Sequence, residues 1–187
     1  MIEIKRAHKE QSAEIARLIM IAMTDECCLY FCGEGYGLTD FHKMMTSLVE
    51  RTDSQYSYKN ALVAMDNDKL VGVAVSYDGA LLHELRQVFI EVAREQIGKD
   101  HSLIDDETQA GELYLHSLAV IPEYRRQGIP QRLLKATKEK ANQMKIPCVG
   151  LLVDKGNPAG ESLYLSVGFR YVNDNQWGGH PMKHLIL

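Results

Sequence analysis

The sequence contains no apolar run that approaches the roughly 20 residues of a membrane-spanning helix, and Met1–Arg6 lacks the apolar segment of a secretory signal. It has no excess of positive charge either: 21 Lys and Arg residues stand against 25 Asp and Glu residues, a net charge of −4. A chain with this balance does not attract polyanions as a whole, so any anion site must be local. We therefore expect a cytoplasmic protein whose partners are neither nucleic acid nor membrane.

Cysteine is scarce, and its distribution matches neither a disulfide framework nor a metal site. Cys27, Cys28 and Cys32 are crowded together, whereas Cys148 lies far along the chain. Disulfide-rich secreted proteins carry regularly spaced cysteines, and structural zinc sites use paired Cys-x-x-Cys ligands. With His42 as the only nearby histidine, we expect reduced thiols and no metal.

Linkers rich in Pro, Gly and Ser, internal repeats and low-complexity tracts are also absent. The 187 residues are 45% hydrophobic and 25% charged, which is typical of a soluble globular protein. A chain of this length buries roughly 70% of its extended surface on folding, which is enough for a core without disulfides or metal. We expect one α/β domain over residues 1–187.

Hydrophobic periodicity predicts the order of the elements. Alternating or continuous apolar residues predict seven strands, at residues 2–5, 61–65, 70–75, 113–120, 149–153, 169–172 and 182–187. Apolar residues at helical spacing predict helices at residues 15–22, 41–49, 81–97 and 130–144, and a short one through Tyr164. Thr39 is the expected N-cap of the second helix.

Three segments between these elements are predicted to be irregular. Residues 25–37 contain several glycines and are expected to form a flexible loop that lines a site. The acidic run Asp105–Glu107 is expected to be a loop. Trp177–Pro181 is typical of a turn between the last strands, and it would border a site only by folding back over it.

The segment Leu118–Pro130 combines an apolar strand, a turn and the start of a basic helix. Seven basic residues and one acid lie between Tyr124 and Lys145, although the protein as a whole is acidic. These basic residues are Arg125, Arg126, Arg132, Lys135, Lys138, Lys140 and Lys145. A basic helix alone is most often a solvated face, but Gly128 lets the backbone approach a phosphate at the helix start. We therefore predict a diphosphate site here.

Two common nucleotide motifs do not fit this turn, because it lacks both the three-glycine pattern of a Rossmann site and the Gly-Lys-Ser/Thr ending of a P-loop. Instead, Arg125–Pro130 resembles the signature of the GNAT acetyltransferase superfamily: Arg or Gln, two residues, Gly, one residue, then Gly or Ala. The flanking segments that also resemble the family, in the same order, are Leu118–Val120, Asn157–Ala159, Leu163–Tyr164 and Val167–Phe169.

This resemblance implies a fold, a co-substrate and a set of contacts. It implies a central mixed, mostly antiparallel twisted sheet of about seven strands flanked by helices, an α/β (α+β) architecture, with acetyl-CoA as the co-substrate. The residues expected to contact acetyl-CoA are Leu118, Ala119, Val120, Arg125, Arg126, Gln127, Gly128, Ile129, Pro130, Gln131, Asn157 and Tyr164. The N–H of Leu118 would hold the thioester oxygen, and its strand would pair with the pantetheine arm. A homodimer is a further expectation from the family.

The resemblance also indicates two catalytic side chains. Tyr164 occupies the position of the family tyrosine that protonates the leaving thiolate, although by itself it is more typical of a core tyrosine. Tyr114–Val120 resembles the His-x-His strand of arylalkylamine N-acetyltransferases, with His116 matched and Tyr114 replacing the first histidine. An imidazole with a pKa of about 6.5 can accept a proton near neutral pH, but a lone histidine on an apolar strand is more often a core residue.

Two features depart from the family pattern. Many members carry a glutamate at the Tyr114 position, and this residue is absent. Pro130 stands where Gly or Ala is usual and removes one N–H from the helix start, so we expect weaker binding of acetyl-CoA. In a regular strand Glu112, Tyr114 and His116 share one face, and they would line the acceptor channel together unless a bulge intervenes.

The sequence thus predicts an acetyl-CoA-dependent N-acetyltransferase for the primary amine of a small molecule. The acidic residues Asp25, Glu26, Glu34 and 105–107 would attract a cationic acceptor. Two alternatives stay open. One is an acyl-CoA-binding or regulatory module without turnover, which Pro130 and the missing glutamate favour. The other is an enzyme for protein or peptide amines, which an open acceptor groove would favour.

Overall fold

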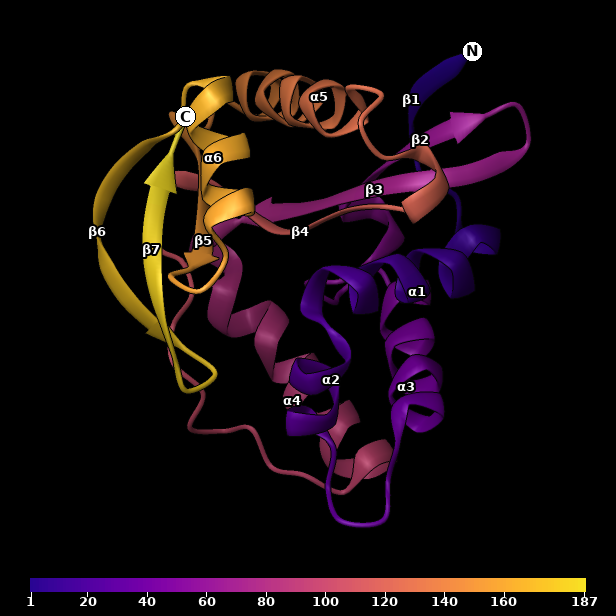
Figure 1. Ribbon diagram of the computed structural model, residues 1–187. Coiled ribbons are helices and arrows are strands. Elements are labelled where there is room, and N and C mark those ends of the chain that lie inside the picture. Colours follow the sequence, from indigo (N-terminus) through magenta and orange to yellow (C-terminus); the bar gives the residue numbers. More distant parts are fainter.

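The computed structural model describes all residues 1–187 and contains one seven-stranded sheet with six α-helices (Figure 1). The strands are β1 (Ile2–Arg6), β2 (Ala61–Asp66), β3 (Lys69–Asp78), β4 (Glu112–Val120), β5 (Cys148–Asp154), β6 (Arg170–Trp177) and β7 (His180–Ile186). The helices are α1 (Ser12–Met23), α2 (Asp25–Phe31), α3 (Leu38–Glu50), α4 (Leu82–Ile97), α5 (Ile129–Met144) and α6 (Pro158–Val167). The seven strands and the mixed α/β class confirm the expected fold.

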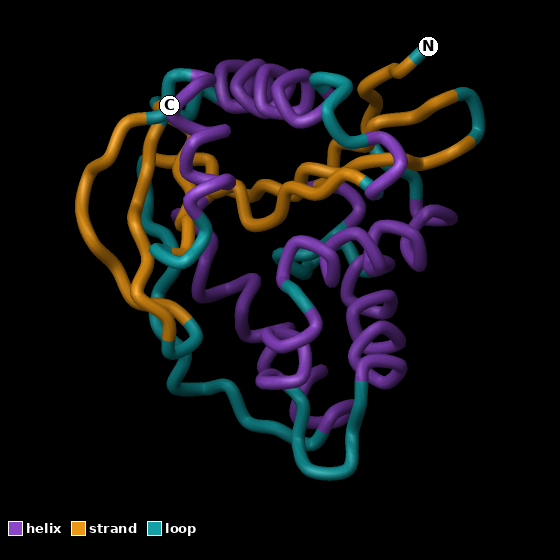
Figure 2. Tube along the Cα trace, in the orientation of Figure 1, coloured by secondary structure: helices purple, strands orange, loops and turns teal.

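The strand order is β1-β2-β3-β4-β5-β7-β6, and every neighbouring pair is antiparallel except β4 and β5. Helix α5 covers one face of the sheet, and α1 packs on the other face against β3 and β4. Helix α3 lies against α1 and α4 beyond that second face, and α2 connects α1 to α3 (Figure 2). The sheet is therefore the middle layer of a three-layer arrangement.

One large hydrophobic core joins the layers. The helical spacing in α1 and α3 correctly predicted most of the buried side chains, since Ile15, Leu18 and Ile19 and the α3 residues Phe41 and Met44 are fully buried. Ala22, at the end of the predicted spacing in α1, is exposed instead. The predicted cap of α3 was wrong: the N-cap is Gly37, whose N–H donates to Asp40 Oδ2 at 2.9 Å. Thr39 lies within the first turn instead. No helix combines the length and the apolar character needed to cross a membrane.

The segment that was expected to be a flexible loop begins with a helix. Residues 25–31 form α2, which buries Cys28 and Phe31 on one side and begins at the N-cap Thr24. The Thr24 hydroxyl accepts a hydrogen bond from Cys27 N at 3.4 Å. Thr24 has φ 75° and ψ 154°, a region that is essentially restricted to glycine and costs about 1–3 kcal/mol. This sharp reversal joins α1 to α2, with Thr24 as the single residue between the two helices.

Strands β4 and β5 separate after a short parallel contact, and this split positions the site. They pair only from Glu112 to Tyr114 on β4 and from Cys148 to Gly150 on β5. Beyond this contact β5 pairs with β7, while the β5 side of β4 has no strand partner as far as Val120. The two strands diverge in Figure 1, with α6 following β5 and the start of α5 following β4.

Candidate active site

A cavity of about 680 Å³ lies at the split between β4 and β5. Its walls come from the α1–α2 junction, from β4 and β5, from the start of α6 and from the β6–β7 hairpin. The residues of the sequence-predicted set that line it are His116, Leu118, Asn157 and Tyr164. The fold thus gathers four candidate residues that are as far as 48 positions apart in the sequence (164 minus 116) into one enclosure.

The open edge of β4 presents backbone groups to this split. Ile121 N donates to Val71 O at 3.0 Å, which fixes the hydrogen-bonding register between β3 and β4. Because N–H and C=O groups alternate sides along an antiparallel strand, those of Leu118 and Val120 point away from β3. The side chain of Arg125 reaches Val120 O from this open side, with Nε at 3.4 Å. The N–H of Leu118 is therefore free to donate to a ligand in the cleft.

The turn before α5 forms a second row of free donors. Arg126 and Gly128 both adopt left-handed conformations, with φ of 61° and 72°, and α5 begins at Ile129. The backbone N–H groups from Arg126 to Ile129 and that of Gln131 donate to no other group of the protein. Successive free N–H groups at a helix start form an anion cradle. Pro130 interrupts this row, since it has no N–H.

The basic residues around this turn do not all face solvent. The ammonium of Lys140 is buried and donates to Ser76 O at 2.7 Å and to Asn60 O at 3.0 Å. Burial lowers the pKa of Lys140 to about 8. Arg132 Nη2 donates to Ile2 O at 2.7 Å. Part of the basic helix face thus fastens α5 to the sheet, while Arg125, Arg126 and Gln127 are exposed beside the cradle.

Asn157 and Tyr164 both reach the cavity from α6, Asn157 at its N-cap and Tyr164 two turns further along. Asn157 is the N-cap of this helix, and its Oδ1 accepts from Gly160 N at 2.9 Å. Tyr164 packs edge-on against Phe169, with 5.6 Å between ring centroids. Burial raises the pKa of Tyr164 to about 12, so the phenol keeps its proton at neutral pH. It is therefore a potential proton donor.

His116 is the extra residue of a β-bulge in β4. Val75 of β3 pairs with Ser117 and Ser76 pairs with Leu115, so His116 has no partner on β3. The bulge explains why His116 and its neighbour Ser117 both line the cavity. Nδ1 of His116 lies 2.8 Å from Ser117 Oγ. Burial lowers the pKa of His116, which favours the neutral imidazole needed by a base.

Aromatic rings enclose His116 on several sides. Its ring lies edge-to-face with Tyr56 at 4.8 Å and with Tyr114 and Trp177 at 6.2 Å each. The β6–β7 turn therefore does fold back over the site, and Trp177, Gly178 and His180 line the cavity. Nε1 of Trp177 is buried and has no hydrogen-bond partner in the protein, so it is a donor that a bound ligand would satisfy.

Glu112 does not join Tyr114 and His116 at the cavity. Its carboxylate is buried and accepts from Thr108 Oγ1 at 2.5 Å, and it lies 2.7 Å from His184 Nε2. The bulge at His116 changes the regular alternation of the strand, and Glu112 lies in the paired part of β4 under Gly150. The Glu112 carboxylate therefore has a structural role: it links β4 to Thr108 and to His184 of β7.

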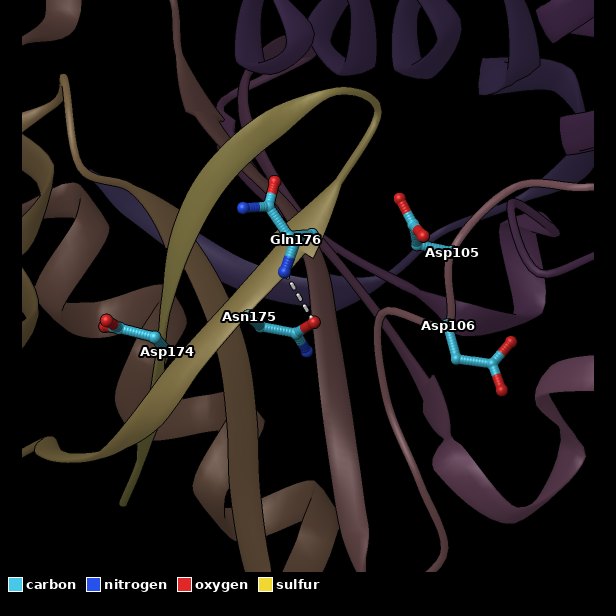
Figure 3. A pocket seen from close by; sticks show the side chains of 5 residues that line it. All are labelled: Asp105, Asp106, Asp174, Asn175 and Gln176. Atoms are coloured by element: carbon cyan, nitrogen blue, oxygen red, sulfur yellow. Dashed lines mark hydrogen bonds between the residues drawn. The ribbon is translucent and has the colours of Figure 1, made fainter.

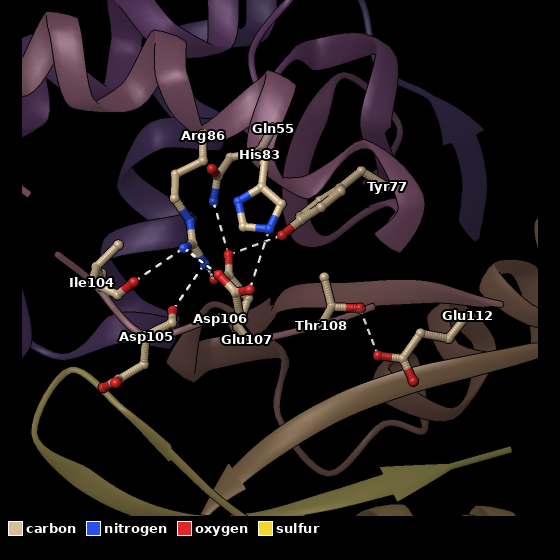
Figure 4. A network of polar contacts seen from close by, with 10 residues as sticks. All are labelled: Gln55, Tyr77, His83, Arg86, Ile104, Asp105, Asp106, Glu107, Thr108 and Glu112. Carbon is tan, nitrogen blue, oxygen red and sulfur yellow. Dashed lines mark hydrogen bonds and ion pairs between the residues drawn. The ribbon is translucent and has the colours of Figure 1, made fainter. Parts of the chain in front are cut away.

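A buried ionic network, shown in Figure 4, adjoins the aromatic rings around His116 through Tyr77, whose ring lies edge-to-face with Tyr114 at 5.6 Å. Arg86 of α4 forms an ion pair with Glu107, and both side chains are buried. Tyr77 donates to Glu107 Oε1 at 2.9 Å and Gln55 to the same oxygen at 3.3 Å. The Glu107 carboxylate raises the pKa of His116, although burial outweighs this effect. The acidic run was expected to be a loop, which it is, but Glu107 is a buried structural group.

A second cavity of about 420 Å³ lies between the loop after α4 and strand β6 (Figure 3). It is lined only by polar residues, namely Asp105, Asp106, Asp174, Asn175 and Gln176. In Figure 3 the carboxylates of Asp105, Asp106 and Asp174 point in different directions. No group of three His, Cys, Asp or Glu side chains in the protein is arranged to hold a metal ion.

Sequence reasoning anticipated part of the cavity wall. Glu26 and Cys27 fall in the segment that was expected to line a site, although they reach the cavity from helix α2 and not from a loop. The turn at Trp177 was expected to border the site only by folding back, and it does so. Sequence reasoning missed Asp154 at the end of β5, and it missed Tyr56, which packs against His116 behind the cavity wall and lies in a segment without periodicity.

Comparisons with known proteins agree with this geometry. The model of the acetyltransferase (GNAT) family matches residues 36–169. A crystal structure described as an acetyltransferase is 27% identical to this chain, with a TM-score of 0.81. The match covers 98% of this chain and 97% of that one. An N-acetyltransferase from Staphylococcus aureus Mu50 is 22% identical, with a TM-score of 0.82 and coverage of 99% and 100%.

A more distant similarity is to the NatC complex bound to Gag peptide and CoA, at 18% identity and a TM-score of 0.58, covering 100% of this chain and 97% of that one. No curated protein matched the chain. The family match spans β4 and β5, whose split lies at the cavity, as well as the anion turn and helix α6. The chain therefore belongs to the acetyltransferase (GNAT) family of acyltransferase enzymes.

Proposed function

We propose that the protein transfers an acetyl group from acetyl-CoA to the primary amine of a small molecule. The GNAT family uses acetyl-CoA, whose thioester supplies the activated acetyl group. The observation that carries the proposal is the convergence of a free strand N–H, a neutral imidazole and a protonated phenol on one cavity. These are the groups that acyl transfer to an amine requires.

The residues fit the two ends of the co-substrate. The free N–H groups from Arg126 to Ile129 suit its diphosphate, and the unpaired edge at Leu118 and Val120 suits an extended amide-containing arm. Asn157 stands beside this edge at the start of α6. The contacts at the turn and along the β4 edge use backbone groups, so they tolerate the substitution of individual side chains.

We assign one role to each candidate catalytic group. His116 accepts the proton of the acceptor ammonium, directly or through water, and so supplies a neutral amine. The N–H of Leu118 donates to the carbonyl oxygen as charge develops on it. Tyr164 donates its proton to the departing sulfur. One C–N bond forms and one C–S bond breaks. The acceptor ammonium loses two protons: His116 passes the first to solvent, and the second leaves the nitrogen after attack and replaces the proton that Tyr164 gave to sulfur.

The size of the cavity favours a small acceptor. Its volume of about 680 Å³ is typical of a small-molecule site, and the β6–β7 hairpin and α2 close it on two sides. An enzyme for protein amines would present a more open groove.

The first test is a calorimetric titration of the protein with acetyl-CoA, with CoA and ATP as comparators. We expect saturable one-site binding that prefers acetyl-CoA to ATP. Release of free thiol from acetyl-CoA is then measured with a panel of small amines and with peptides that carry a free N-terminus or lysine. Binding without thiol release would identify a binding module, and release only with peptides would identify a peptide acetyltransferase.

A further inference from the structure

The charges that line the active-site cavity all have one sign. Glu26 and Asp154 contribute carboxylates, and no lysine or arginine lines the cavity. Two histidines also line the wall. Burial lowers the pKa of His116, and His180 Nδ1 lies 3.1 Å from Asp154 Oδ2, so His180 partners Asp154 and not Glu26. A bound cation would meet two carboxylates and no lysine or arginine that competes for them.

The carboxylates of Glu26 and Asp154 come from different elements but both line the cavity near Cys27. Glu26 belongs to the first turn of α2, and Asp154 ends β5. The pKa of the Cys27 thiol is raised to about 11, mainly by burial and in smaller part by the negative charges of Glu26 and Asp154. Their fields therefore meet at Cys27, which also lines the cavity.

Only one of these carboxylates has its charge engaged within the protein. Asp154 Oδ1 accepts from Gly156 N at 2.6 Å, and Oδ2 faces His180. Glu26 forms no ion pair with any residue of the chain. Across the cavity, the rings of Tyr114 and Trp177 provide an apolar and aromatic surface that suits an alkyl chain or a cation.

We propose that the acceptor is a short diamine, with one amine directed to His116 and the second, positively charged end bound by Glu26 and Asp154. This inference rests on the proposed function and names its substrate class. Glu26 is the main specificity residue, because its charge has no other partner. Asp154 contributes a second, partly engaged charge.

The test compares acceptors that differ only at the distal end. Values of kcat/KM are measured at fixed pH for 1,4-diaminobutane, butylamine and 4-aminobutanoate, and for the corresponding sets that are one carbon shorter and longer. The same measurements are made on Glu26→Gln and Asp154→Asn. The matched control is Glu34→Gln, which makes the same chemical change at an exposed residue outside the cavity.

We expect at least one diamine to exceed its matched monoamine by about tenfold, since each partly exposed ion pair contributes a factor of a few. The amino acid should be the poorest acceptor of each set. Glu26→Gln should bring the diamine-to-monoamine ratio down by about fivefold, Glu34→Gln should keep it, and added salt should reduce it.

Equal kcat/KM for diamines and monoamines, or a ratio that Glu26→Gln leaves intact, would overturn the diamine assignment while the acetyltransferase proposal stands. Absence of thiol release with every amine, in a protein that binds acetyl-CoA, would overturn the proposed function and the assignment together.

Discussion

The two sides of the cavity are built from different parts of the chain. On the side proposed for acetyl-CoA, the free groups are backbone N–H groups, at Leu118 in the cavity wall and from Arg126 to Ile129 in the turn before α5. On the acceptor side they are side chains, above all His116, Trp177 and Glu26. Backbone donors are present whatever the residue, whereas side chains change with every substitution. The comparison explains how one fold can keep its co-substrate while its acceptor varies.

Tyr164 stands where the two sides meet, and its removal should have the largest effect. Tyr164→Phe should lower kcat by about 1,000-fold, because general acid catalysis contributes roughly 10²–10⁴-fold, and should leave the Kd for acetyl-CoA nearly unchanged. Steady-state kinetics and calorimetry measure the two quantities. Tyr171→Phe is the control, since Tyr171 is exposed on β6. Unchanged turnover would remove Tyr164 from the mechanism.

The acceptor side depends on the buried ion pair behind it. Glu107→Gln should lower the free energy of unfolding by about 3 kcal/mol, because it leaves the buried Arg86 without its counter-charge. Asp106→Asn removes a half-exposed partner of the same Arg86, 2.8 Å away, and should cost no more than about 1 kcal/mol. Urea denaturation measures both. Equal losses would show that the burial of Glu107 has no special role.

The third prediction concerns the base on the acceptor side. A base acts when deprotonated, and burial lowers the pKa of His116. A free imidazole has a pKa of about 6.5. Because the pKa of His116 is lower, wild-type kcat should stay constant down to and somewhat below about pH 6.5 before it declines in more acidic solution. His116→Gln should lower kcat by about 100-fold and remove this acidic limb. A pH–rate profile with the same limb in the variant would exclude His116 as the base.

The turn that directs α2 over the cavity is strained, and relief of the strain should be measurable. Thr24→Gly should raise the free energy of unfolding by about 1 kcal/mol, because glycine adopts the φ of 75° freely and the loss of the cap costs only a few tenths. Thr24→Ala keeps the strain and loses the cap, so it should lower stability by about 1 kcal/mol. Denaturation midpoints that move in the same direction would contradict this account.

The smallest effect is expected on the affinity for acetyl-CoA, at the backbone N–H groups before α5. Pro130→Gly restores one N–H to the row of donors before α5 and should tighten acetyl-CoA binding by about threefold, as one additional hydrogen bond gives. Arg126→Ala, which leaves the backbone donor in place, should change Kd less than twofold. An unchanged affinity in Pro130→Gly would show that the missing N–H does not face the diphosphate.

Local patterns were enough to locate most of the elements and the anion turn. The apolar spacing of α1 and α3 predicted most of their buried residues, and Gly128 before α5 predicted a helix start with exposed donors. The short helix α2 was missed because seven residues with two adjacent cysteines carry too little periodicity. Its Thr24 cap was also hidden, since a β-branched residue rarely adopts a positive φ.

The sequence by itself determined the strand and helix order, the position of the anion turn and the family resemblance, because each depends on residues that are close together in the chain. The tertiary structure decided which side chains share the cavity. The bulge that turns both His116 and Ser117 into it arises from the register of β3 against β4. The return of Trp177 over His116 and the burial of Glu107 beneath Tyr77 depend on packing between distant segments, which no local pattern records.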